Sequence, residues 1–416
     1  MAKNLIGDNV SEINYLLMHK DHIVCGMQLD HFGKIEKINV NINELEHQPF
    51  GTSSKQIRLK KWWNDRAIPL TRHEAKTALS KLGYTSTGSM LIDNLALSLN
   101  DCYWIKPIGS NLRWKDVSLF SNKFEDDFGT LTLNRFATIN LKNKTLFNSA
   151  TSQGELQKKW CIDKDGRRFM VKGNYGSSFQ QSINELFATE LHKKQGFKNY
   201  TPYFKTNLDI GKDNSAIGCS SYCFCNEKVE SISAWDIIES RIKPNHISTF
   251  QHFRSICIEN GIKEKEFDDY FDYLIMTDFL LSNTDRHMNN VAVLRNPDTL
   301  KFIGLAPIYD TGNSMFFRTS TVDLRYVNPY KIEITSFVKT EVKMLKLVKN
   351  RMALDLNKTD MDFSIYSKFG KLDNKRVREL ERLFNVKKEI LRKFQEGSNP
   401  WQRSKWCLHS LSIHKN

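Results

Sequence analysis

Apolar and polar residues alternate along residues 158–173, and this period of two predicts a β-hairpin. The expected strands cover 158–162 and 169–173, and Asp165 with Gly166 favours the tight turn between them. The period then lengthens to that of a helix over about 179–194, where apolar residues recur at helical spacing. Strand-like runs return over 200–226.

From Ala234 onward the pattern is mainly helical, interrupted only over 282–340. Two amphipathic helices with lysine and arginine on their polar faces are expected near 341–354 and 374–396. A small strand-rich unit therefore precedes a larger helical one. The change of pattern near residues 140 and 230 predicts three domains, at 1–140, 141–230 and 231–416.

The first of these domains mixes short strand-like and helical segments and predicts an accessory α+β unit. Its clearest helix covers 71–83. Thr71 is the expected N-cap, Glu74 would complete a capping box, and Gly83 fits the C-terminal stop. No repeat or low-complexity segment interrupts the chain.

The composition is that of an ordinary globular protein, with 40% hydrophobic and 26% charged residues among 416. No apolar stretch approaches the length of a membrane span, and the first residues lack the pattern of a secretion signal, so we expect a cytoplasmic protein. The formal net charge of +14 favours anionic partners such as a nucleotide, a nucleic acid or an acidic protein. The basic residues are spread along the chain, so a solvated basic surface is the favoured explanation.

Eight cysteines are scattered along the chain, and three of them cluster at Cys219, Cys223 and Cys225. No second CxxC pair or histidine pair completes a zinc-binding set with that cluster. Reduced, mostly buried thiols are therefore the expected state.

The polar loop after the apolar run that ends at Leu281 carries the strongest chemical signal. Asp285 and Asn290 lie five positions apart, and an apolar strand-like segment then leads to Asp310. An acid that orients a hydroxyl, followed by an amide and an acid that hold Mg²⁺, is the arrangement of a phosphotransfer site. Asp285 alone would equally suit an N-cap or a turn.

Lys172, at the end of the second hairpin strand, is the candidate for a phosphate contact. Met170 alternates onto the same face and is placed to cover an adenine ring. A kinase-type lysine needs an acid from the next helix. The helical wheel places Glu190 on the apolar face and Glu185 on the opposite side, where Ser182 and Glu185 would also suit a capping box.

Upstream of the hairpin, Ser152, Gln153, Gly154 and Glu155 form a segment that is able to turn over phosphates through backbone N–H groups. It contains one glycine and is not a glycine-rich G-x-G-x-x-G loop.

Together these segments resemble the HipA-type serine/threonine kinases, a family of bacterial proteins best known as toxin kinases. NTDRHMNN is similar to that family's Asp-x-His-x-x-Asn loop, with Asp285, His287 and Asn290 in the matching places. LAPIYD is similar to its metal segment, and TSQGELQKK to its phosphate loop. The chain departs from the family at the first glycine of that loop and at Arg286, where glycine is frequent.

The resemblance implies an α+β, bilobal protein-kinase-like fold, ATP and Mg²⁺ as cofactors, and a protein with a Ser/Thr acceptor as substrate. Asp285 would be the catalytic base, assisted by Lys172 and His287, and Asn290 and Asp310 would bind the metal. Nucleotide binding would involve the following residues: Lys172, Glu185, Ser152, Gln153, Gly154, Cys223, Phe224 and Cys225.

The resemblance also favours Glu185 over Glu190 as the partner of Lys172, against the helical wheel. Ser149 and Ser152 are the candidates for an autophosphorylated serine. A toxin–antitoxin role would add an antitoxin-like partner protein, with nucleic acid bound only indirectly. Two other functions stay open: a phosphoinositide-type lipid kinase, and a non-catalytic kinase-like module that binds DNA or an antitoxin-like protein.

Overall fold

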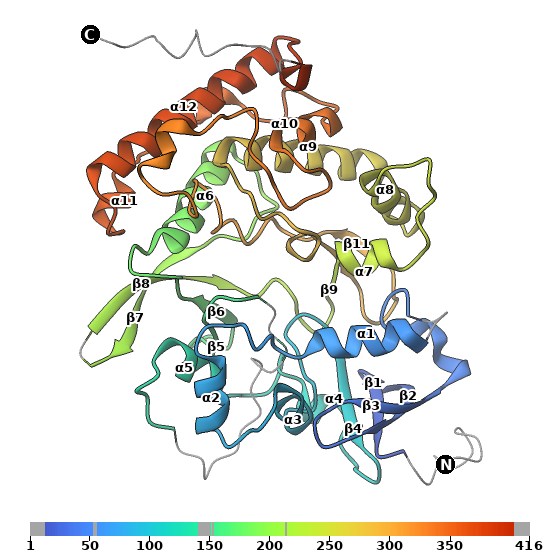
Figure 1. Ribbon diagram of the computed structural model, residues 1–416. Coiled ribbons are helices and arrows are strands. Elements are labelled where there is room, and N and C mark those ends of the chain that lie inside the picture. The colour runs from blue at the N-terminus through green and yellow to red at the C-terminus, as the bar shows by residue number, and fades with distance from the viewer. Residues whose placement is uncertain (1–12, 53–55, 140–150, 152–153, 213, 403–416) are drawn as a thin grey trace, which may run out of the picture.

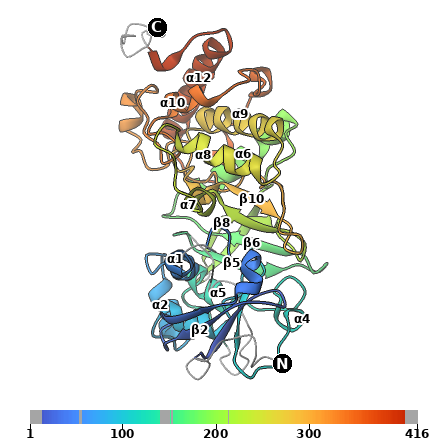
Figure 2. The same ribbon diagram turned by 90° about the vertical axis from the view of Figure 1, so that its right-hand side faces the viewer.

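The computed structural model describes residues 13–52, 56–139, 151, 154–212 and 214–402. Its elements are stacked in three tiers (Figure 1; Figure 2). The N-terminal strands and their helices form one end, a four-stranded sheet lies in the middle, and the long helices form the other end.

The N-terminal tier is built on an antiparallel sheet of order β3-β2-β1-β4. The helices α1–α3 pack apolar residues such as Leu59, Trp63 and Met90 against it. These elements are β1 (Tyr15–His19), β2 (His22–Leu29), β3 (Ile35–Val40), the 3-10 helix η3 (Ile42–His47), α1 (Gln56–Arg66), α2 (Ala75–Lys81), α3 (Thr87–Asp93), β4 (Tyr103–Pro107), α4 (Trp114–Val117) and α5 (Asp127–Leu133).

The helix predicted over 71–83 is shorter than expected at its beginning. α2 starts at Ala75, and Glu74 has a left-handed φ of 61° without a side-chain cap, so the predicted Thr71 capping box is wrong. Arg72 and His73 instead donate hydrogen bonds to backbone carbonyls of the 154–155 segment, which holds the chain out of a helical path. The predicted stop at Gly83 is confirmed by its φ of 78°.

The middle tier is an antiparallel sheet of order β5-β6-β8-β7, with α6 packed on it. The predicted hairpin is confirmed, with Lys158 opposite Lys172 in the register. The helix predicted over about 179–194 is confirmed as well, as α6. The elements are β5 (Lys158–Ile162), β6 (Arg168–Lys172), α6 (Gln180–Gln195), β7 (Phe204–Gly211) and β8 (Asn214–Tyr222).

The third tier combines the long helices with a small sheet of order β11-β10-β9. Its strands are β9 (Glu230–Ser233), β10 (Ala292–Arg295) and β11 (Phe302–Leu305), and its helices are α7 (Ala234–Glu239), α8 (Thr249–Glu259), α9 (Glu264–Leu281), η5 (Met288–Asn290), η6 (Asp323–Tyr326), α10 (Glu341–Met344), η7 (Leu345–Leu347), η8 (Leu356–Lys358), α11 (Ile365–Lys368), α12 (Asn374–Gln395) and η9 (Pro400–Gln402).

Of the two predicted C-terminal helices, the structure confirms one and contradicts the other. The helix predicted over 374–396 is confirmed as α12, although its Lys387 is fully buried rather than on the polar face. The helix predicted over 341–354 is wrong, because α10 ends after one turn. The carboxylate of Asp272 accepts the backbone N–H groups of Lys349 and Asn350 at 2.8 and 2.7 Å, and these bonds take the place of helical ones.

One hydrophobic cluster joins the N-terminal tier to the middle tier. Trp104 and Trp114 from the first pack with Trp160 of β5 and with Cys225, which follows β8. A larger cluster fills the third tier and reaches α6 through Ile183 and neighbouring residues. Within the described chain, none of the helices is both long and apolar enough to cross a membrane.

Candidate active site

Lys172 lies where the middle and third tiers meet, at the end of β6. Its ammonium group contacts Glu185 Oε1 at 3.1 Å, Asp310 Oδ1 at 2.8 Å and the Tyr203 hydroxyl at 3.0 Å. Burial favours the neutral amine, but the charges of Asp310 and Glu185 outweigh it and hold the pKa of Lys172 well above its usual value. The lysine is therefore a fixed cation held between two acids.

Of the two candidate acids on α6, the structure brings Glu185 to Lys172. Glu185 is buried, and its second oxygen accepts the backbone N–H of Thr311 at 2.9 Å. The side chain of Glu190 is 49% exposed and contacts Lys193. Glu185 thus links α6 both to the lysine and to the segment that carries Asp310, and it does not form the alternative capping box, since α6 begins before Ser182.

Asp310 follows β11 in a left-handed conformation with φ of 57°, which is uncommon for a residue other than glycine. This backbone turns its carboxylate toward Lys172 while the side chain stays 38% exposed. Burial opposes ionisation, but the positive charges of Lys172 and Lys158 outweigh it and keep the pKa of Asp310 well below its ordinary range. The group is an anion at neutral pH, as a metal-binding carboxylate must be.

The loop with Asp285 begins where α9 ends, at Ser282, whose φ of 51° reverses the chain. Asp285 Oδ2 accepts the side-chain amide of Asn313 at 2.6 Å. The side-chain oxygen Oδ1 of Asn313 accepts from the Gln181 side chain of α6 at 2.8 Å, so Asp285 is oriented through Asn313 and Gln181 to that helix. Asn290 donates its own amide to the backbone oxygen of Asp285 at 3.1 Å, which closes the loop.

Arg286 holds the two loops of the site together, although sequence reasoning gave it no role. Its buried guanidinium pairs with Asp278 of α9 through contacts of 2.8 and 3.1 Å. It also donates to the backbone carbonyls of Asn290 and Tyr309 and to the Thr311 hydroxyl. The residues on either side of Asp310 are thereby fixed against the Asp285 loop.

His287, predicted to assist catalysis, begins η5. Its Nδ1 accepts the backbone N–H of Asn289 at 3.2 Å, which is the role of an N-cap. Its ring is half-buried, and the contact supports the shape of the loop between Asp285 and Asn290.

The predicted phosphate segment is described from Gly154 onward, and Ser149, Ser152 and Gln153 lie outside the described residues. Gly154 has a φ of 91°, and a Cβ on it would lie 3.0 Å from Lys158 Nζ. Buried Arg72 donates to the Gly154 carbonyl at 3.1 Å. The segment is therefore held between a residue of the N-terminal tier and the first lysine of β5.

Lys158 is a second lysine of the site that sequence reasoning missed. Burial, together with the charges of Arg72 and Lys172, lowers the pKa of Lys158 to about 7. Its pairing with Lys172 in the hairpin register was the available signal, because both side chains then point to one face of the sheet.

Cys223, Phe224 and Cys225 form the connection that follows β8. The Phe224 ring lies 5.7 Å from the ring of Tyr309, next to Asp310, which places this connection beside the site. Cys223 donates its thiol to the Leu99 carbonyl at 3.4 Å and Cys225 is buried. Both are free thiols, as expected for the cluster. Met170 likewise packs into the cluster shared with the N-terminal tier.

Asn290 and Asp310 offer a donor set that fits a hard divalent cation. The Asn290 amide nitrogen is engaged with the chain, which leaves its oxygen as the ligand atom. One carboxylate oxygen of Asp310, Oδ1, accepts from Lys172, and the other oxygen could bind a metal ion. Oxygen donors of this kind are those that Mg²⁺ prefers.

Comparisons with known proteins identify the fold. No family model matches the chain, and no curated protein matches its sequence. The chain is similar to HipA of Shewanella oneidensis MR-1, solved with HipB and operator DNA as a toxin–antitoxin system, at a TM-score of 0.54 and 11% identity over 92% of this chain and 100% of that one. It is also similar to the proinflammatory kinase CtkA of Helicobacter pylori, at a TM-score of 0.43 and 16% identity over 57% and 94% of the two chains.

The superposition on HipA spans nearly the whole chain and shows a shared α+β architecture. The protein therefore has a bilobal, protein-kinase-like fold of HipA type, and the predicted fold class is confirmed.

Proposed function

We propose that this protein is an ATP- and divalent-metal-dependent protein serine/threonine kinase of HipA type. The observation that carries the proposal is the contact of Lys172 with both Glu185 and Asp310, at 3.1 and 2.8 Å, beside a loop that orients Asp285. A lysine paired with a helix acid and an acid poised for metal is the arrangement of an assembled phosphotransfer site.

In the proposed reaction Asp285 accepts the proton of a serine or threonine hydroxyl. The hydroxyl oxygen then bonds to the γ-phosphorus of ATP while the bond to the β-γ bridging oxygen breaks and ADP leaves. Lys172 and Lys158 would neutralise charge on the phosphates. Asn290 and Asp310 would hold Mg²⁺, which supplies further neutralisation when it is bound. Positioning and electrostatics of this kind supply most of the catalysis in phosphoryl transfer.

The test is incorporation of γ-phosphate into protein by the wild type, Asp285→Asn and Asp310→Asn. Asp269→Asn is the matched control, because Asp269 lies on the exposed face of α9 and pairs only with Lys265 among the contacts of the described chain. We expect activity in the wild type and the control and its loss in both site variants. Equal activity in all four proteins would contradict the assignment, and transfer to phosphoinositide vesicles without protein labelling would make the enzyme a lipid kinase.

The acceptor and the partner are further parts of this proposal. Phosphoproteomics of cells that express the wild type or Asp285→Asn would identify the acceptor, and a phosphosite at Ser149 or Ser152 would establish autophosphorylation. The likeness to HipA over 92% of this chain supports an antitoxin-like partner protein, since that HipA was solved with HipB. Growth arrest by the wild type but not by Asp285→Asn is the outcome expected of a toxin.

A further inference from the structure

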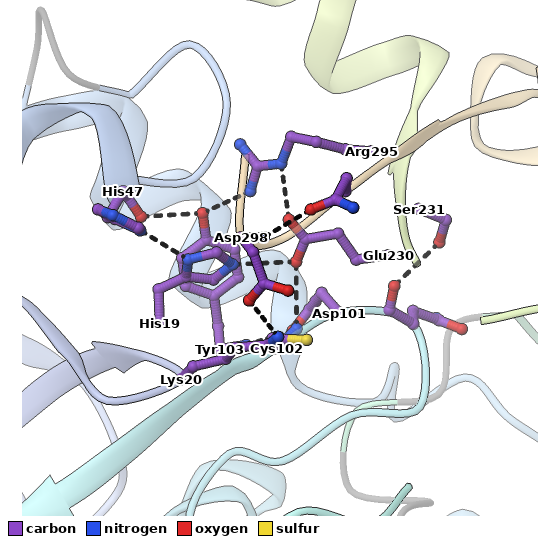
Figure 3. A network of polar contacts seen from close by, with 12 residues as sticks. His19, Lys20, His47, Asp101, Cys102, Tyr103, Glu230, Ser231, Arg295 and Asp298 are labelled. Carbon is purple, nitrogen blue, oxygen red and sulfur yellow. Dashed lines mark hydrogen bonds and ion pairs between the residues drawn. The ribbon is translucent and has the colours of Figure 1, made fainter. Parts of the chain in front are cut away.

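A polar network joins the N-terminal tier to the third tier (Figure 3). His19, the last residue of β1, faces Glu230 of β9 at 3.2 Å through its Nε2. Glu230 also accepts from Arg295 of β10 at 2.6 Å and from the Cys102 backbone N–H at 3.2 Å. His19, Glu230 and Arg295 are all buried.

The same network reaches a second histidine, His47 at the end of η3. The Nδ1 atoms of His19 and His47 lie 3.0 Å apart. The His47 backbone carbonyl accepts the hydroxyl of Tyr103, which in turn accepts from Arg295 at 2.9 Å. Figure 3 shows these contacts as a closed ring that passes through the Tyr103 hydroxyl.

The hydrogen bonds of this network suit one tautomer of His47. Paired with Arg295, the Glu230 carboxylate can only accept, so His19 Nε2 must carry a hydrogen. A hydrogen on His47 Nδ1 that points to His19 Nδ1, 3.0 Å away, completes the chain of hydrogen bonds between the two rings. The Nε2 of His47 is then left with its lone pair.

That nitrogen faces two further ligand-type groups. His47 Nε2 lies 3.8 Å from Glu44 Oε2, and the same oxygen lies 3.4 Å from His22 Nδ1. The donor atoms of the three residues all fall within 4.8 Å of one another. Two zinc ligands at tetrahedral angles and at normal zinc–nitrogen distances stand roughly 3.3 Å apart, so these donors are nearly at ligand spacing.

From this geometry we propose that His22, Glu44 and His47 bind a divalent transition-metal ion, with zinc as the natural occupant. Imidazole nitrogens with one carboxylate are a zinc-type donor set, and a water would complete four-coordination. The chain from His47 through His19 to Glu230 supplies the carboxylate–histidine support that orients zinc-ligating histidines. The His22 and His47 rings lie stacked, with centroids 3.7 Å apart and planes 13° from parallel. Because the nitrogen lone pairs lie in the ring planes, the exposed His22 ring would turn out of this stack to bind the ion.

The ion would clamp η3 to the β1–β2 turn, because Glu44 and His47 lie on η3 while His22 begins β2. Its effect would extend to the third tier through His19 and Glu230. Bound zinc would therefore raise the melting temperature of the whole chain, since a ligand that binds only the folded state stabilises it.

The experiment is competition for Zn²⁺ between the full chain and a colorimetric chelator. All proteins carry Asp310→Asn so that the kinase metal site does not contribute. In that background we compare His22→Ala and Glu44→Gln with the control variants His31→Ala and Glu46→Gln, which alter exposed residues on the same tier. The side chain of His22 is 51% exposed, so its loss does not open the core.

We expect one zinc per chain in the background protein and in both controls, with a zinc-dependent rise in melting temperature. Affinity should fall at least about 100-fold in His22→Ala and in Glu44→Gln, more than the loss of a supporting outer residue causes. Substitution with Co²⁺ should give a spectrum without thiolate bands. Equal zinc affinity in all five proteins, cobalt–thiolate bands, or the absence of zinc binding by the background protein would each overturn the proposal.

Discussion

At the scale of single residues, the pairing of Lys172 is decided by position rather than by helix amphipathicity. The helical wheel favours Glu190 as the partner of Lys172 because it assumes that a helix has a single buried face. However, α6 is buried on two sides. Ile183 and Leu191 face the core of the third tier, while Glu185 and Gln181 face the site. An acid on a polar but buried face is invisible to a pattern that equates polar with exposed.

This geometry predicts opposite outcomes for the two acids of α6. Glu185→Gln should lower kcat/KM for ATP on the order of 10²-fold, the usual effect of removing one preorganised electrostatic contact. Glu190→Gln, at an exposed position, should leave kcat/KM unchanged. Steady-state kinetics on both variants measures this, and a larger effect at Glu190 would contradict the assignment of the pair.

The contacts of the Arg286 guanidinium predict that the folded protein becomes less stable when this group is replaced. Lys at this position keeps the charge but cannot make the paired contacts with Asp278 and the loop carbonyls. Arg286→Lys should therefore lower the free energy of unfolding, by up to about 3–5 kcal/mol if the buried pair is broken outright. Urea denaturation compares it with Arg318→Lys at an exposed site, and matching midpoints would show that the guanidinium does not hold the loops.

At the scale of elements, the hairpin β5–β6 buries Lys158 near Arg72 and opposite Lys172, and this predicts a pH-dependent stability. The pKa of Lys158 is about 7 in the folded protein, against an ordinary value of 10.5. Between these values the unfolded chain binds a proton that the folded chain lacks, so stability rises with pH. The free energy of unfolding of the wild type, relative to Lys158→Met, should rise by up to about 1.4 kcal/mol per pH unit across that window.

Urea denaturation of both proteins at several pH values between 7 and 10 checks this slope. Lys159→Met is the control, because the neighbouring side chain points to the other face of β5 and is less buried. A stability difference between the wild type and Lys158→Met that does not change with pH would contradict the lowered pKa of Lys158.

Sequence periodicity predicted the elements that are held by their own residues. The hairpin, α6 and α12 follow their periods, and the Asp285 loop follows its motif. Elements shaped by distant contacts were missed. α2 is shortened by the contacts of Arg72 with the 154–155 segment, and α10 is cut short where Asp272 of α9 captures the following backbone.

In the candidate site, too, some features could be predicted from the sequence and others could not. The order of lysine, helix acid, Asp285 loop and Asp310 follows from the sequence, and the geometry brings Lys172, Glu185 and Asp310 together. Arg286 and Lys158 were missed because their roles depend on partners on other elements, Asp278 of α9 for Arg286 and Lys172 of β6 for Lys158. The division at residues 140 and 230 stays a prediction.

At the scale of the whole molecule, the cluster shared by Trp104, Trp114, Trp160 and Cys225 ties the N-terminal tier to the kinase-like tiers. Glu230 and Arg295 reinforce the same boundary through their contacts with His19 and Tyr103. Because the shared surface is apolar and buried, separating the tiers would expose it to water. The chain should therefore unfold in one cooperative transition.

Calorimetry of the full chain and of Trp104→Ala tests this coupling. Trp104 is fully buried and donates its indole N–H to the Lys20 carbonyl at 2.8 Å, so its truncation should cost about 3–5 kcal/mol. The single transition should move to lower temperature without splitting, while Trp235→Ala, at a partly exposed site of α7, should move it little. Two transitions, of which only one responds to Trp104→Ala, would show instead that the N-terminal tier folds independently and that the shared cluster is a docking contact.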